Sequence, residues 1–276
     1  MKILDGKKLA DEILRKLKKE IKTKRLKLKL AVVLVGEDSA SKVFIRKKQE
    51  ACKRIGVNFE LSEFPSKISR SKLKKEIDKI VKNPANSGIV IQLPLPRGFN
   101  PQEFLNLIPP EKNIEVFSPV VCAISYLLKE YRISLKGKKI VLVGTGRLVG
   151  LPLALWLSKE KANFEVLDKF TKNISSFVKK ADIIISGVGK PNLIAGKMVK
   201  RGVVVIDAGT TFRKPASAKA SASGQTKSVG KGKLVGDVDF KSVAKKASYI
   251  TPVPGGVGPL TVACLLENLV KISKTN

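Results

Sequence analysis

The sequence predicts an α/β fold with two lobes, each a doubly wound unit around a parallel sheet. Short, continuous apolar runs alternate with amphipathic helical segments, which is typical of strands buried on both faces of such a sheet. Prolines cluster after residue 93 and interrupt this alternation, and a second alternating run begins near residue 138. We therefore expect two lobes with a cleft between them.

The first lobe is expected to begin with a helix over 7–22 and a strand over 28–36, where the apolar run LKLAVVLVG ends in glycine. Apolar residues in 41–57 recur at helical spacing, and Gly56 is a suitable C-cap for that helix. The alternation then continues with a strand near 57–62, a helix near 70–82 and the strand GIVIQL at 88–93.

A boundary is expected near 118–130, which gives an N-terminal domain of residues 1–120 and a second domain of residues 121–258. The stretch 214–233 is rich in Ala, Ser, Gly and Lys without periodicity, so we interpret it as a flexible excursion. The remaining elements are expected to be helices at 119–131, 151–161 and 259–273, and strands at 138–144, 164–168, 182–186, 203–207 and 247–251.

Composition excludes several classes of protein. Hydrophobic residues make up 43% of the chain, which is too high for a disordered protein. No apolar run approaches the roughly 20 residues that cross a bilayer, and the N-terminus does not resemble a signal peptide, so a cytoplasmic protein without membrane contact is expected. The chain has no histidine, so acid–base chemistry falls to Lys, Asp, Glu or Tyr.

The three cysteines, Cys52, Cys122 and Cys264, lie far apart in the chain and form no CxxC pair. We interpret them as small buried apolar residues, and we expect no metal site. The formal charge of +31 raises the hypothesis of a nucleic-acid-binding protein. Because the lysines are spread through nearly every segment and few aromatic residues accompany them, nucleic acid is not the partner we favour.

A glycine-rich turn follows the strand that ends at residue 143. Gly144, Gly146 and Gly150 are spaced as G-x-G-x-x-x-G, one residue longer than the usual dinucleotide fingerprint. Such glycines permit a tight turn and a close approach of backbone to a pyrophosphate at a helix N-terminus. Glycines also occur in plain turns, but a strand before and a helix after favour dinucleotide binding here.

The strand after the glycine turn ends in two residues that point to different cofactors. Asp168 stands where a carboxylate could bind the ribose 2′-hydroxyl of NAD, and Lys169 could pair instead with the 2′-phosphate of NADP. Either residue could equally be a solvated loop charge. The choice between NAD and NADP stays open on these residues.

Ser41, Phe44 and Lys48 share one face of a predicted helix, because they fall at positions i, i+3 and i+7. If that face were buried, desolvation would lower the pKa of Lys48 toward that of a useful base; otherwise Lys48 is one more solvated lysine. Gln92 ends the strand IVIQ at the sheet edge where ligands bind, and it is either a site residue or a structural hydrogen-bonding group.

The loop PVPGGVGP, residues 252–259, joins rigid prolines to glycines just before the last helix. Such a loop can bring bare backbone amides close to a ligand. A tight turn between domains explains the same residues equally well.

Five segments, taken together, resemble the bifunctional methylenetetrahydrofolate dehydrogenase/methenyltetrahydrofolate cyclohydrolase family. In chain order they are SKVFIRKKQEACKRIGV, GIVIQLPLP, VGTGRLVGLP, ADIIISGVGKPNLI with KRGVVVIDAG, and GDVDF with ITPVPGGVGPLT. The resemblance covers almost the whole chain. It implies an N-terminal folate-binding catalytic domain, on which the last helix (259–276) packs back, and a Rossmann-like NAD(P)-binding domain.

The resemblance also implies the activity. The family oxidises 5,10-methylenetetrahydrofolate with NADP and hydrolyses the methenyl product to 10-formyltetrahydrofolate, in one-carbon metabolism that supplies purine biosynthesis, as a homodimer. By position, Lys48 matches the catalytic lysine and Gln92 the glutamine that hydrogen-bonds it. Pro252 and Gly256 match folate-contacting positions, while the cofactor-contacting segments correspond to Gly144, Thr145, Gly146, Lys169 and Thr210.

The sequence departs from the family pattern at several of these positions. Phe44 replaces a tyrosine, and Glu115 stands where an aspartate grips the pterin ring. Thr145 and Gly146 replace the Arg-Ser pair of many members, which removes one contact to a 2′-phosphate, although Arg147 follows directly. The departures raise a narrower hypothesis of a single-activity or weakened relative, beside the bifunctional enzyme and the basic binding protein.

Overall fold

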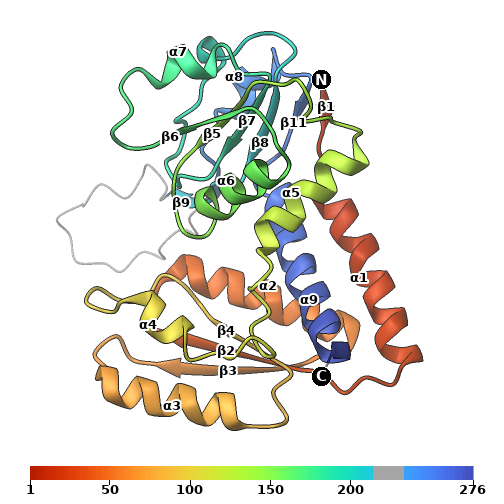
Figure 1. The fold of residues 1–276 in the computed structure, drawn as a ribbon, viewed down its shortest axis with the longest axis vertical. Helices are drawn as coiled ribbons and strands as arrows, with labels where there is room; N and C mark the ends of the chain where they lie inside the picture. Colours follow the sequence, from red (N-terminus) through yellow and green to blue (C-terminus); the bar gives the residue numbers. More distant parts are fainter. Residues whose placement is uncertain (214–232, 276) are drawn as a thin grey trace, which may run out of the picture. The chain divides into compact units, whose positions relative to one another are not determined.

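The computed structural model describes residues 1–213 and 233–275. All of the expected excursion 214–233 except Lys233 lies outside the described residues. The chain forms two compact units (Figure 1). We call residues 7–123 with 259–276 the N-terminal unit, and residues 1–6 with 124–258 the C-terminal unit. In the described part of the chain no helix is long and apolar enough to span a membrane.

The N-terminal unit is built on a three-stranded parallel sheet in the order β3-β2-β4. Its strands are β2 (Lys29–Val35), β3 (Asn58–Phe64) and β4 (Gly88–Ile91). The helices are α1 (Gly6–Thr23), α2 (Ser39–Ile55), α3 (Arg70–Lys82), α4 (Pro101–Leu105) and α9 (Val257–Thr275). Except for the short α4, each of these elements was expected from the apolar pattern.

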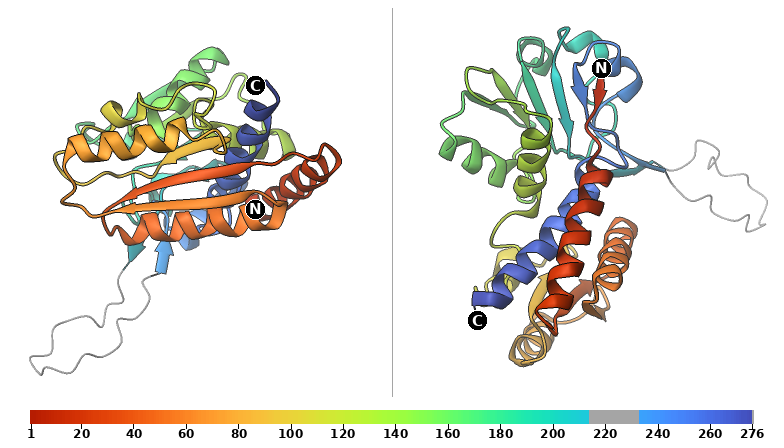
Figure 2. Two further views of the ribbon diagram at one scale, coloured as in Figure 1. Left: turned by 90° about the horizontal axis from the view of Figure 1, so that it is seen from below. Right: turned by 90° about the vertical axis from the view of Figure 1, so that its right-hand side faces the viewer.

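Side chains from α3 and α4 cover one face of this sheet. Leu73 and Ile77 of α3 and Phe104 of α4 pack with Val33 of β2 and Ile89 of β4, all fully buried. Helices α1 and α9 lie side by side, as both views show (Figures 1 and 2), and Lys274 pairs with Glu20 between them.

Helix α2 carries the residues of greatest interest, and both of its ends are defined by the local sequence. Asp38 is the N-cap, and its carboxylate accepts from the backbone N–H of Ser41 at 2.7 Å. Gly56 ends the helix in the left-handed region at φ 84°, and its N–H bonds the Cys52 carbonyl. This confirms the predicted helix and its C-cap.

The C-terminal unit has a six-stranded parallel sheet in the order β1-β11-β8-β7-β5-β6. The strands are β1 (Lys2–Ile3), β5 (Ile140–Val143), β6 (Phe164–Leu167), β7 (Ile183–Ser186), β8 (Val204–Asp207) and β11 (Tyr249–Ile250). The other elements are α5 (Pro119–Glu130), α6 (Gly150–Lys159), α7 (Ile174–Val178), α8 (Phe240–Ala244), a 3₁₀ turn (Gly196–Met198) and the antiparallel pair β9 (Thr211–Arg213) and β10 (Lys233–Val235).

The first residues correct one expectation. Residues 1–6 were assigned to the N-terminal domain, but Lys2 and Ile3 pair with Tyr249 and Ile250 at the edge of the larger sheet. The physical reason is the unpaired edge of β11, whose backbone groups the chain start satisfies. A two-residue strand carries no periodic signal that could have predicted this.

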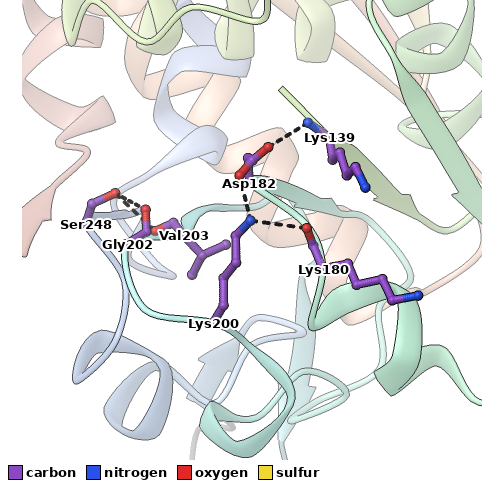
Figure 3. Close-up of polar contacts among 7 residues, drawn as sticks. All are labelled: Lys139, Lys180, Asp182, Lys200, Gly202, Val203 and Ser248. Atoms are coloured by element: carbon purple, nitrogen blue, oxygen red, sulfur yellow. Dashed lines mark hydrogen bonds and ion pairs between the residues drawn. The ribbon is translucent and has the colours of Figure 1, made fainter. Parts of the chain in front are cut away.

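Hydrogen bonds tie together the amino ends of the central strands in this unit (Figure 3). Asp182 precedes β7 and accepts from the Lys139 backbone N–H at 2.8 Å and from Lys200 Nζ at 2.6 Å. Ser248, before β11, donates to the Gly202 carbonyl at 2.8 Å. The bond from Lys200 is the main cause that holds the pKa of Asp182 below its usual value. These bonds connect the amino ends of the strands. The glycine turn after β5 lies at the opposite end of the sheet, where the strands have their carboxyl ends.

Candidate active site

Lys48 and Gln92 meet inside the N-terminal unit. The Lys48 side chain comes from α2 and is only 9% exposed, and Gln92, directly after β4, is 8% exposed. Lys48 Nζ donates a hydrogen bond to Gln92 Oε1 at 2.9 Å. The helix face that carries Lys48 therefore points inward, and the two residues that the sequence singled out separately form one pair.

The position of Gln92 follows from the strand that it ends. Its backbone N–H bonds the Val33 carbonyl at 2.8 Å and so extends the β4–β2 ladder by one residue. Its side-chain Nε2 donates to the Leu93 carbonyl at 2.8 Å. Because the amide nitrogen is occupied in this way, the amide oxygen is the atom that faces the lysine. The side chain holds the amine in place without adding charge.

Burial controls the protonation of this site. Loss of solvent lowers the pKa of Lys48, and the neighbouring Glu115 and Cys52 oppose that change. Burial likewise raises the pKa of Glu115, against the influence of Lys48, and it raises the pKa of Cys52 to about 12. A lowered pKa makes the neutral amine, the form that can accept a proton, more available than in a solvated lysine, which is what a general base requires.

Ser41 and Phe44 occupy the same helix as Lys48. Ser41 is buried, and its hydroxyl donates to Asp38 Oδ2 at 2.8 Å and to the Leu93 carbonyl at 3.3 Å. The hydroxyl thus links the start of α2 to the segment after Gln92, a structural role that sequence spacing could not show. Phe44 is half-buried.

In the C-terminal unit the glycine turn has the close packing that a dinucleotide-binding turn needs. Gly144 has φ +107°, a conformation that favours glycine. A Cβ on Gly150 would lie 2.0 Å from the Gly144 carbonyl oxygen, so no side chain fits there. Thr145 and Gly146 are exposed, and α6 begins directly at Gly150. The cradle therefore fits a dinucleotide, whose pyrophosphate these backbone amides could hold.

The two residues at the end of β6 have partners of their own. Asp168 Oδ1 accepts from the Phe170 N–H and the Thr171 hydroxyl, both at 2.9 Å, and the Thr171 bond is the main cause of its lowered pKa. Lys169 Nζ lies 4.8 Å from the centre of the Phe170 ring. Asp168 thus shapes its own turn, and the choice between NAD and NADP stays open.

Pro252 and Gly256 lie in the turn that leads into α9. The Gly256 N–H bonds the Pro252 carbonyl at 2.8 Å, and a Cβ on Gly256 would come within 2.7 Å of that carbonyl. The loop is thus a tight turn that requires glycine at this position. Thr210 is half-buried just before β9. Ligand contacts at these three positions stay predictions.

Sequence reasoning missed a buried carboxylate network at the carboxyl edge of the larger sheet. Asp237 accepts from the Ser186 hydroxyl (2.7 Å) and from the backbone N–H groups of Val188 (2.7 Å) and Lys190 (2.8 Å). Asp207 likewise accepts from backbone N–H groups, including that of Val238 at 2.9 Å. Burial raises the pKa of Asp207 to about 6. The network fixes the loop after β7, which packs against the glycine turn at Gly144.

A signal for this network was present. Asp207 ends the apolar strand VVVID, as Gln92 ends IVIQ, and the same argument about strand ends applies to both. Asp237 lies in GDVDF, a segment that the resemblance included without singling out any residue.

The C-terminal unit has a glycine turn at the carboxyl end of a parallel sheet, and the N-terminal unit buries a lysine against an amide. Together these two features define the class of protein. The protein is a two-domain α/β enzyme that uses a dinucleotide. Family models bear this out over most of the chain. Residues 4–115 match the tetrahydrofolate dehydrogenase/cyclohydrolase catalytic domain, and residues 119–276 match the NAD(P)-binding domain of the same name.

Related proteins match this chain along nearly its whole length. A Nautilia profundicola protein described as "Bifunctional protein FolD" is 41% identical, with 99% of this chain and 98% of that protein covered. A FolD structure from Trypanosoma brucei, in complex with NADP and an inhibitor, has a TM-score of 0.91 at 31% identity, covering 100% and 98% of the two chains. The Campylobacter jejuni bifunctional FolD structure has a TM-score of 0.87 at 36% identity, covering 100% and 99%. The chain belongs to the tetrahydrofolate dehydrogenase/cyclohydrolase family.

Proposed function

We propose that this protein oxidises 5,10-methylenetetrahydrofolate with NAD(P) and hydrolyses the methenyl product to 10-formyltetrahydrofolate. The observation that carries the proposal is the buried Lys48 amine, held at 2.9 Å from the amide oxygen of Gln92. Membership of the family and the activities of its bifunctional members support both reactions.

In the hydrolysis, water attacks the positively charged methenyl carbon and a proton must leave. Lys48 in its neutral form has a lone pair that can accept this proton, because burial lowers its pKa. Gln92 accepts one N–H of the amine in either protonation state and so directs the lone pair away from itself. Lys48 is the catalytic base in this proposal, and Gln92 is its positioning residue.

In the oxidation, the methylene carbon loses a hydride and becomes cationic. The bound dinucleotide supplies the hydride acceptor. A neutral lysine beside the folate avoids a like charge near this developing cation, whereas an ammonium would oppose it. Glu115, half-buried near Lys48, would grip the pterin ring, with its carboxylate one methylene further out than the aspartate of the family pattern. Phe44 would stack on the folate, and Pro252 and Gly256 would contact it through their loop.

The cofactor is proposed to lie across the glycine turn, with its pyrophosphate over Gly144 to Gly150. NADP is the proposed cofactor, supported by its presence in the Trypanosoma brucei relative. Lys169 and Arg147 are exposed and are the proposed contacts to a 2′-phosphate near this turn, and Thr210 is the proposed contact from the loop before β9.

A homodimer is proposed from the exposed apolar surface of the C-terminal unit. Leu151 and Leu155 of α6 are 54% and 66% exposed and lie one helical turn apart, and Val166 of β6 is 40% exposed. Strand β6 is the last in the sheet order, so its outer backbone groups have no strand partner among the described residues. A second copy could cover both features.

Turnover of the purified chain tests the proposed function. The protein is given 5,10-methylenetetrahydrofolate with NADP or with NAD, and reduced cofactor and methenyl product are followed by absorbance. Methenyltetrahydrofolate is supplied separately to measure its hydrolysis. We expect turnover in both assays. If folded protein shows neither reaction with either cofactor, the proposed function is wrong; if only one reaction occurs, the single-activity hypothesis holds.

A further inference from the structure

A thiol-rich cluster lies in the N-terminal unit, where the first turn of α5, which belongs to this unit, meets α9. Cys122 comes from α5, and Cys264 and Glu267 come from α9. Their sulfur and carboxylate oxygen atoms all lie within 4.8 Å of one another. The Cys122 thiol donates to Glu267 Oε2 at 3.8 Å. The interpretation of the cysteines as small buried apolar residues therefore does not describe Cys122, which is only half-buried and forms this hydrogen bond.

We propose that Cys122, Cys264 and Glu267 bind a thiophilic divalent cation of the zinc type, with water as a fourth ligand. Two thiolates and one carboxylate are donors that suit such an ion, whereas they do not suit magnesium or calcium. The ion would join α5 to α9 and so act structurally, outside the folate chemistry.

The dimensions of the cluster suit a tetrahedral ion. Metal bonds of about 2.3 Å to sulfur and about 2.0 Å to oxygen place neighbouring ligand atoms roughly 3.5–3.8 Å apart. The separation of Cys122 Sγ and Glu267 Oε2, at 3.8 Å, already has this value. The other separations, at most 4.8 Å, need to shorten by at most about 1.3 Å. Cys264 and Glu267 are three residues apart on one helix, so they already face the same side.

The charge of the cluster and its exposure to solvent also suit a bound divalent cation. Two thiolates and a carboxylate carry three negative charges, so a divalent ion leaves one. Lys271 Nζ lies 3.5 Å from Glu267 Oε1 and can balance that remaining charge. Cys264 is fully buried, while the Glu267 side chain is 18% exposed, so an ion and its water can enter from the Glu267 side.

Without metal the buried Cys264 thiol holds its proton more firmly than a solvated cysteine does. The contact with the Cys122 thiol, and after it burial, raises the pKa of Cys264 above the usual cysteine value. A bound cation displaces such protons, because it favours the thiolate.

Cobalt and zinc titrations of the full-length chain test the proposal. Metal-stripped, reduced protein is titrated with Co²⁺, and the thiolate-to-cobalt charge-transfer absorption is recorded; Zn²⁺ affinity is then measured against a chromophoric chelator. We expect one ion per chain with the thiolate band, displaced by zinc. Cys122→Ser should weaken zinc binding by more than about 100-fold, and Glu267→Gln by at least about tenfold. Both changes are at half-buried positions, and circular dichroism verifies that each variant is folded.

Cys52→Ala is the matched control, because Cys52 is a buried cysteine that is not part of this cluster. It should bind zinc as tightly as the parent chain. The proposal is overturned if the parent chain binds no cobalt, if bound cobalt shows no thiolate band, or if Cys122→Ser binds zinc with unchanged affinity.

Discussion

At the scale of single residues, the site depends on which way one lysine points. Sequence spacing placed Ser41, Phe44 and Lys48 on one helical face, but among 54 lysines and arginines nothing in the spacing could show that this face is buried. The structure places Lys48 against Gln92, with both side chains under 10% exposed. Burial depends on contacts between α2 and the segment after β4, which are distant in sequence. Only the resemblance anticipated this pair.

Gln92→Glu tests whether a neutral partner matters. A carboxylate at this position would form an ion pair with Lys48 and raise its pKa, so the amine would stay protonated at higher pH. We expect methenyltetrahydrofolate hydrolysis at neutral pH to fall by about 10- to 100-fold. The rise of the rate with pH should also move to higher pH, since only the neutral amine acts as a base. Rate–pH profiles of the two proteins measure this.

Gln49→Glu is the control for that change, because Gln49 lies on the same helix and is exposed. Its profile should overlay that of the parent protein. An unshifted profile for Gln92→Glu would show that Gln92 does not act through the protonation of Lys48.

The effect of Phe44 and Glu115 on the two activities is hard to predict from the sequence. If they suppress one of the two reactions, the double variant Phe44→Tyr with Glu115→Asp should restore it, changing the ratio of dehydrogenase to cyclohydrolase rates by roughly tenfold or more. The reason is that a phenol gains a hydrogen bond and the shorter carboxylate returns to the pattern of the family. Initial rates of both reactions, on the same protein preparations, provide the measurement. A ratio that does not change contradicts the single-activity hypothesis.

At the scale of elements, the apolar strands and the helices of ten or more residues were predictable, whereas the five-residue helices were not. The buried strand β2 is a continuous apolar run of seven residues, and the helices α2 and α3 carry clear apolar periodicity over a greater length. By contrast, α4, α7 and α8 have five residues each, too few for a periodic signal. The buried carboxylates at the sheet edge were missed for a different reason. Their partners are mostly backbone N–H groups, which the side-chain pattern does not identify, so the position of Asp207 at the end of its strand was the signal that remained.

Asp237→Asn tests the role of that network. Asparagine offers one acceptor oxygen where the carboxylate offers two, so part of the bonding to Ser186, Val188 and Lys190 is lost. We expect the free energy of unfolding to fall by about 1–3 kcal/mol. We also expect the KM for the dinucleotide to rise more than kcat falls, because the loop after β7 packs against the glycine turn.

Asp239→Asn is a matched control two residues away. Asp239 caps α8 through the Ser242 N–H, and asparagine caps a helix about as well as aspartate does. Thermal unfolding and steady-state kinetics should therefore change little for this variant. Equal effects of the two substitutions would contradict a special role for Asp237.

At the scale of the whole molecule, the fold class was predicted correctly from alternating apolar and amphipathic segments. What the sequence could not provide is the pairing of segments far apart in the chain. Lys2 and Ile3 pair with Tyr249 and Ile250 of β11, 247 positions further along the chain, because an open sheet edge accepts them. Five of the basic residues lie together in the described part of the chain. Lys18, Lys22, Arg25, Lys53 and Arg54 line an open hollow of about 400 Å³ at the ends of α1 and α2. Lys22, Lys53 and Arg54 of this group lie in the last turns of α1 and α2, where cations complement the helix dipole, so these three are explained without a nucleic acid.

Leu155→Glu tests the proposed dimer. Leu155 is 66% exposed on α6, so a carboxylate there costs little in the isolated chain but would be buried, unpaired, in an apolar interface. We expect light scattering to show a dimer for the parent protein and a shift of at least about tenfold in the dissociation constant for the variant. A parent chain that is monomeric at micromolar concentration would contradict the dimer.

The most direct test of the account is the hydrolysis of methenyltetrahydrofolate by Lys48→Met, compared with the parent protein over a range of pH. Methionine keeps the volume of the lysine stem but has no amine. We predict that the parent rate rises with pH through a lowered lysine pKa, and that the variant loses at least about 100-fold of this rate at all pH values while still folded. A folded Lys48→Met protein that hydrolyses the substrate at the parent rate would contradict the central claim that the buried amine performs the chemistry.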